Sequence, residues 1–133
     1  MMFSGSDHGI VSIQSSYSFN ETVQRLLSAF TSHHIKVFAT IDQAAEALTV
    51  GMTMPPTTLI IYGNPKAGTP LMLAKPLCGI DLPLKVLVTE LRPGEVTVSF
   101  NSARYIVERH SLPAEFLSHL TPAESLIPAA LTQ

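Results

Sequence analysis

The alternation of apolar and polar residues predicts a strand followed by an amphipathic helix at the start of the chain. Val11 and Ile13 alternate with polar neighbours, as in a strand with one buried face. Ser18 and Glu21 then have the spacing of a capping box. Four apolar residues after this box share one helical face: Val23, Leu26, Leu27 and Phe30. We therefore expect a helix that continues to about His33.

Strand patterns recur along the first hundred residues. Five segments have them: 10–14, 35–41, 58–62, 84–90 and 95–100. The third is almost continuously apolar, which is typical of a central strand buried on both faces. Arg92-Pro93-Gly94 suits a type II turn and predicts a hairpin between the last two segments. Residues 42–54 favour a short helical turn that ends at Gly51.

Prolines mark the remaining helices. The segment 63–83 contains four prolines and three glycines, which predicts a structured loop. Inside it, Thr69 is expected to cap a short helix with Pro70 in its first position. Asn101 or Ser102 is expected to cap a later helix. Two short helical pieces follow, each opened by a proline: Pro113 and Pro122.

This order of elements predicts an α+β fold, with a mostly antiparallel sheet of about five strands and helices packed on one face. The 133 residues suit a single domain covering 1–133. Hydrophobic residues make up 46% and charged residues 14%, a composition that excludes disorder. A net charge of −2 gives no basic footprint for nucleic acid.

Composition also limits the cofactors and the compartment. The single Cys78 excludes an internal disulfide, and the five histidines show no metal-ligand spacing, so we expect no metal and no cofactor. Residues 1–8 lack the basic start and apolar run of a signal peptide. No apolar run reaches the roughly 18 residues of a membrane span. These observations predict a cytoplasmic protein without membrane segments.

Three stretches carry a family resemblance: Ala39-Thr40-Ile41-Asp42-Gln43-Ala44-Ala45, then Tyr62-Gly63-Asn64-Pro65-Lys66-Ala67-Gly68-Thr69-Pro70-Leu71-Met72, then Gly79-Ile80-Asp81-Leu82-Pro83-Leu84-Lys85. Together they resemble the DUF302 family of small bacterial and archaeal proteins, whose function is undefined. The resemblance covers residues 9–112 and leaves 113–133 as a helical tail. It implies a β-α-β(4)-α fold of TBP-like architecture and a homodimer. Gln43 departs from the family pattern, which often has His at that position.

The distinctive stretches also contain the candidate site. Two glycines, Lys66 and Thr69 suggest a loop that binds an anion ahead of a helix, although the order of residues is not that of a P-loop. The alternative is a tight turn whose glycines serve only the backbone. Charged residues at predicted strand ends extend the set, and the resemblance adds a histidine. The candidate ligand-binding residues are Asp42, Asn64, Lys66, Gly68, Thr69, Asp81, Lys85 and His110.

Three functional hypotheses follow from these residues. The first is a small non-catalytic domain that binds a polar or anionic small molecule at the Asn64–Thr69 loop and acts as a dimer. The second is an enzyme in which Asp42 and Lys66 act as acid and base, which Gln43 makes less favourable. The third is a protein-interaction module that uses the apolar tail, whose alternative is to pack back on its own domain.

Overall fold

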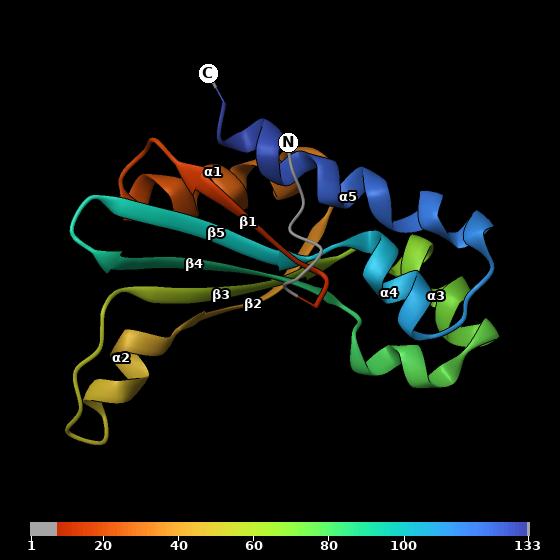
Figure 1. Ribbon diagram of the computed structural model, residues 1–133, viewed down its shortest axis with the longest axis horizontal. Helices are drawn as coiled ribbons and strands as arrows, with labels where there is room; N and C mark the ends of the chain where they lie inside the picture. Colours follow the sequence, from red (N-terminus) through yellow and green to blue (C-terminus); the bar gives the residue numbers. More distant parts are fainter. Residues whose placement is uncertain (1–7, 133) are drawn as a thin grey trace.

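A computed structural model describes residues 8–132, and these form a five-stranded antiparallel sheet (Figure 1). The strand order is β1-β5-β4-β3-β2. The strands are β1 (Ile10–Ser15), β2 (Lys36–Asp42), β3 (Thr57–Gly63), β4 (Leu84–Arg92) and β5 (Glu95–Asn101). Residues 1–7, on which the expected absence of a signal peptide rests, lie outside the described range.

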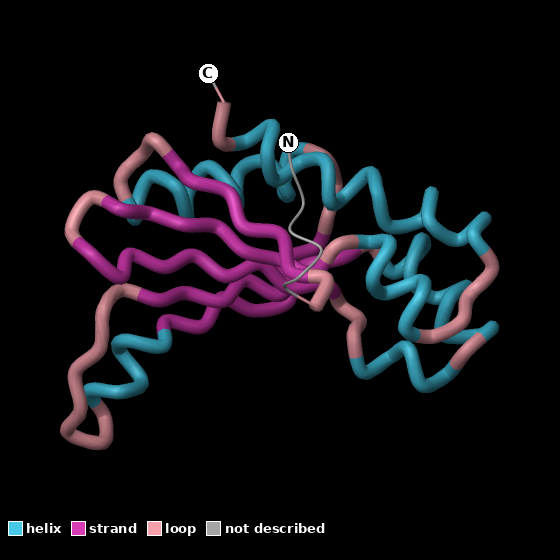
Figure 2. The backbone as a smooth tube through the Cα atoms, in the orientation of Figure 1, coloured by secondary structure: helices cyan, strands magenta, loops and turns pink. Residues whose placement is uncertain are grey.

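The helices lie on one face and at the two ends of this sheet (Figure 2). They are α1 (Phe19–Ser32), α2 (Gln43–Leu48), α3 (Pro65–Ala74), α4 (Ala103–Arg109) and α5 (Leu117–Ala130), with 3-10 turns η1 (Pro76–Ile80) and η2 (Ala114–Phe116). The long helices α1 and α5 cover one face, α3 and α4 gather beyond one end, and α2 projects from the other. The predicted α+β fold is confirmed. None of the helices in residues 8–132 is long and apolar enough to cross a membrane.

The core lies between the sheet and α1 with α5. Val11, Val98 and Ile60 are almost fully buried on the strand faces that meet these helices. The aromatic rings of Phe30 and Tyr62 stack with centroids 4.1 Å apart, which ties α1 to β3. Burial of each such side chain contributes about 1.5–3 kcal/mol, so the apolar stripe predicted for α1 is a main source of stability.

The start of α3 differs from the sequence prediction. Asn64, and not Thr69, caps the helix, because the Asn64 side-chain oxygen accepts the Lys66 N–H at 3.0 Å. Pro65 takes the first helical position, where a missing N–H costs nothing, and Pro70 lies inside the helix. Residues 64–69, predicted as a loop, are therefore a helix cap and the first turns of α3.

The tail also differs from the prediction. The segment expected to form separate pieces around Pro122 is one helix, α5, with two prolines inside it. Three of its apolar side chains, Leu120, Ala123 and Ile127, are buried in the core beside α1 and α4. Such burial offsets the roughly 3 kcal/mol that an internal proline costs a helix. The tail therefore packs on its own domain, which removes the basis for a partner site there.

Candidate functional site

A cavity of about 630 Å³ lies where α3 and α5 meet the end of the sheet. Its walls come from the start of β2, the first turns of α3, the residues that enter β4, and the first half of α5. Most of the lining is apolar, with Phe38, Met72 and Leu82 among the larger side chains. This volume falls within the range of sites for small organic molecules.

Half of the predicted site residues line this cavity. They are Asn64, Lys66, Gly68 and Thr69, all from α3 and its cap. The Lys66 ammonium has no carboxylate partner among residues 8–132. The Thr69 hydroxyl is likewise in no hydrogen bond within that range. Among residues 8–132, the cavity therefore offers the unpaired Lys66 ammonium, the Thr69 hydroxyl and the Asn64 amide NH₂ group as donors.

The backbone at the start of α3 does not offer the anion cradle predicted from its sequence. The Lys66 N–H donates to the Asn64 side chain, and the Ala67 and Gly68 N–H groups both donate to the Asn64 carbonyl oxygen. Pro65 has no N–H to offer. An anion in the cavity must therefore bind to side chains, because the first N–H groups of the helix are already used.

The sequence interpretation missed two polar residues of the cavity, Ser118 and His119. The carbonyl oxygen of Ala67 lies 3.0 Å from Nδ1 of His119. Since a carbonyl oxygen only accepts, Nδ1 carries a proton and Nε2 is the ring nitrogen left for a ligand. This contact joins α5 to α3 across 52 positions, so nothing local in the sequence signals it.

Asp81 and His110 form a separate cluster with Arg109. The buried Asp81 carboxylate accepts from Nη1 of Arg109 at 3.0 and 3.1 Å and lies 2.6 Å from Nε2 of His110. Neither Asp81 nor His110 lines the cavity. Leu82 and Pro83 follow directly and do line it, so the cluster holds a cavity wall against α4. The role is structural.

Cys78 lies close to this cluster and is fully buried. Burial raises the pKa of its thiol, and the negative charge of Asp81 raises it further. A buried thiol in this surrounding is a poor nucleophile. Within residues 8–132, no group of His, Cys, Asp and Glu side chains is arranged to hold a metal ion.

The remaining candidates, Asp42 and Lys85, do not line the cavity. Asp42 caps α2, where its carboxylate accepts the Ala45 N–H at 2.9 Å. It pairs with Thr58 at the start of β3, whereas Lys66 follows the other end of that strand, roughly 17 Å away along the strand. The hypothesis that Asp42 and Lys66 act together as acid and base is therefore wrong. Lys85 lies on β4, with its ammonium 3.5 Å from the Pro83 carbonyl oxygen.

Comparison with known families accounts for nearly the whole chain. The family model described as "Domain of unknown function DUF302" matches residues 11–129. The chain belongs to the DUF302 family. The match continues through most of α5, so it corrects the expectation that the resemblance ends at residue 112. A crystal structure of a DUF302 protein from Bacillus stearothermophilus superposes with a TM-score of 0.77 at 18% identity, covering 92% of this chain and 95% of that one.

Longer proteins also contain a DUF302-like region. The chain is 40% identical over 106 residues to "Fluoride-specific ion channel FluC 1" of Brucella suis biovar 1 (strain 1330), which covers 80% of this chain and 42% of that protein. The protein of the same name from Brucella abortus biovar 1 (strain 9-941) matches over the same 106 residues, 39% of its length. The chain thus spans about two fifths of the curated relatives it matches.

Proposed function

We propose that this DUF302 protein is a non-catalytic domain that binds a small organic molecule with a polar or anionic group in the cavity between α3 and α5. The unpaired Lys66 ammonium at the edge of a largely apolar cavity carries this proposal. Apolar walls with a few convergent polar groups are typical of small-molecule sites. The separation of Asp42 from Lys66 leaves no acid–base pair for the enzyme hypothesis.

Fluoride is a poor match for this cavity, although it appears in the name of the longer relatives. A volume of about 630 Å³ far exceeds a single halide ion. The first N–H groups of α3, which would bind a small anion, already donate to Asn64.

A thermal-shift screen of carboxylates, phosphorylated metabolites and nucleotides tests the proposal. A bound compound at 100 times its Kd is expected to stabilise the fold by about 2.7 kcal/mol. The Lys66→Ala variant should lose this response. Lys75→Ala is the matched control, because Lys75 is exposed at the other end of α3 and does not line the cavity. No response to any compound, or equal responses in both variants, would contradict the proposal.

We also propose that the protein acts as a homodimer through the sheet face opposite α1 and α5. Leu59, Ile61 and Leu87 alternate with the buried strand residues and therefore point to this face. Of the helices in residues 8–132, Figure 2 shows α2 beside this face, at one end. A face of five strands offers about 500 Å², which is less than the roughly 800 Å² that a stable dimer buries on each partner.

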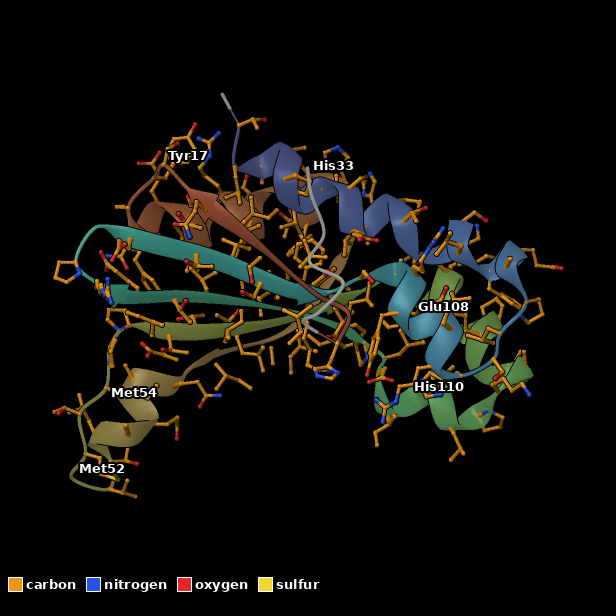
Figure 3. All side chains as sticks on the ribbon, in the orientation of Figure 1. Tyr17, His33, Met52, Met54, Glu108 and His110 are labelled. Carbon is orange, nitrogen blue, oxygen red and sulfur yellow. The ribbon has the colours of Figure 1, made fainter. Side chains whose placement is uncertain are left out.

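The arm, residues 43–56, supplies the missing area. It projects beyond the sheet with Met52 and Met54 near its end (Figure 3). Leu48, Val50 and Met52 are 64%, 72% and 64% exposed. No charged residue occurs from Ala47 to Pro65, so a second copy can cover the part of the arm that follows Glu46 without burying a charge.

Light scattering measures this association. The mass is expected to be twice 14.4 kDa and to fall to one copy in a Val50→Ser, Met52→Ser double variant. Leu77→Ser is the matched control, because Leu77 is 83% exposed but lies on η1 at the other end of the molecule. A monomeric parent, or a dimer that the control disrupts equally, would contradict this interface.

A further inference from the structure

The cavity has charges, hydrogen-bond donors and apolar walls that together indicate which class of ligand it binds. We infer that it binds a carboxylic acid with an apolar tail, in preference to a phosphate ester, an amine or a neutral molecule. This inference rests on the proposed function and specifies its ligand. It assigns the carboxylate to Lys66 and Thr69 and the tail to the apolar wall.

The charge of the lining favours an anion. Lys66 is its permanently charged side chain, and no Asp or Glu within the described range 8–132 lines the cavity. Glu124 follows the lining residue Ala123 on α5. Its carboxylate accepts the N–H of Ala103 at 3.1 Å, so it binds the start of α4. A ligand amine would therefore meet a lysine and no counter-charge, which disfavours it.

The hydrogen-bond donors favour a carboxylate over a phosphate. Phosphate sites in proteins gather several N–H groups from a helix start or a turn. Here those N–H groups donate to Asn64, and the side chains offer the Lys66 ammonium, the Thr69 hydroxyl and the Asn64 amide NH₂ group. One positive charge with neutral donors beside it matches the single charge of a carboxylate. A phosphate ester with two negative charges would keep excess charge.

The rest of the wall favours an apolar tail. The larger apolar side chains of the lining are Ile35, Phe38, Met72, Leu82, Leu84 and Leu120. Met72 is flexible and adapts to tails of different shape. Removing a tail from water against this wall stabilises the complex by about 0.8 kcal/mol per CH₂ group, so affinity should rise with chain length until the cavity is full.

The experiment compares decanoate with decanol, decylamine and decyl phosphate, all below their micelle concentrations. Calorimetry should give decanoate the highest affinity and decanol about tenfold less, the equivalent of one charge-assisted hydrogen bond. Decylamine should not bind. The Lys66→Met variant should bind decanoate only as well as decanol, with its affinity for decanol unchanged. Lys75→Met should behave as the parent.

Methyl NMR of the methionines locates the bound molecule. Met72 lines the cavity, whereas Met52 and Met54 lie on the arm, so only the Met72 signal should shift. Tighter binding of decyl phosphate or decylamine, with Met72 shifting, would overturn the carboxylate and leave the cavity function intact. Shifts at Met52 and Met54 alone would show binding of tails to the arm and overturn the assignment. No binding by any of the four compounds would overturn the carboxylate with an apolar tail, and the thermal-shift screen would then decide separately whether the cavity binds another small molecule.

Discussion

The junctions β2–α2 and β3–α3 both cap a helix with a side-chain oxygen, but the first is exposed to solvent and the second adjoins the cavity. Asp42 ends β2 and caps α2, and Asn64 follows β3 and caps α3, each through a side-chain oxygen that accepts a backbone N–H. Both residues lie in the distinctive stretches of the sequence. Only Asn64 adjoins the cavity of about 630 Å³ between α3 and α5.

The helix above each junction makes the difference. α5 packs against α3 and places His119 on the Ala67 carbonyl oxygen, which closes one side of a hollow. α2 projects into solvent, and none of its residues is buried. A residue in a distinctive stretch therefore indicates a local backbone role, here the capping of a helix. The tertiary packing around that residue decides whether a cavity forms beside it.

The largest expected difference in the free energy of unfolding is between a substitution in the cavity wall and one on the exposed α2. Leu120 lines the cavity and is 3% exposed, so Leu120→Ala is expected to lower the free energy of unfolding by about 2–5 kcal/mol. Leu48→Ala, on the exposed α2, should change it by less than about 0.5 kcal/mol. Urea unfolding of both variants checks this. Similar losses would mean that the arm is as well packed as the cavity wall.

The two caps should have equal structural value. Asp42→Ala and Asn64→Ala are each expected to lower the free energy of unfolding by about 1 kcal/mol, because each leaves one helix N–H without its partner. Only Asn64→Ala should also change ligand binding, since it alters the start of α3. Calorimetry with decanoate on both variants measures the second effect. A change in affinity in Asp42→Ala would contradict the separation of the two junctions.

Alanine substitutions of two glycines, one in α3 and one after α2, should change stability in opposite directions. Gly68 lies inside α3, and a Cβ there would meet only a Leu82 methyl carbon at 3.8 Å, so Gly68→Ala should stabilise the fold by about 0.5–1 kcal/mol. Gly51 follows α2 with φ +78°, where Gly51→Ala should destabilise by about 1 kcal/mol. Thermal unfolding compares the two. Destabilisation by Gly68→Ala would mean that α3 has less room than its contacts indicate.

Glu124, which supports the cavity side from α5, should give the smallest effect. Burial raises the pKa of its carboxyl above the usual 4.5, and the Ala103 N–H partly opposes the rise. The folded state therefore keeps this proton to higher pH than the unfolded state does. The contribution of Glu124 to stability is fully present below pH 4.5 and is lost as pH rises through the higher folded pKa.

The Glu124→Gln variant should remove this component. Unfolding curves of parent and variant between pH 4 and 7.5 give the difference in stability at each pH. That difference should shift in favour of the variant as pH rises. Glu115→Gln is the control, because Glu115 is exposed. A difference independent of pH would mean that the Glu124 carboxyl titrates alike in both states.

Local patterns predicted much of the fold because the relevant contacts are close in sequence. The stripe from Val23 to Phe30 predicted the buried face of α1, and Ser18 caps that helix as expected. The start of α3 was not predictable, because Asn64-Pro65 and Thr69-Pro70 both have a cap followed by proline. Packing of α3 against α5 favours the longer helix.

The candidate site was predicted in part for the same reason. Asn64 to Thr69 line the cavity because one helix carries them all. His119 reaches them from α5, and no periodicity links it to Ala67. Asp81 and His110 do contact each other, but their pairing uses the side chains that a ligand would need. Sequence alone could not show which charges are already neutralised.

The irregular register of β2 between Val37 and Ala39 has a consequence for self-association. β2 is an outer strand of the sheet, and such strands tend to recruit foreign strands through their unpaired backbone groups. A bulge bends the strand and interrupts the regular pattern of backbone hydrogen bonds, so it disfavours the addition of further strands to β2 and the growth of fibrils from this edge.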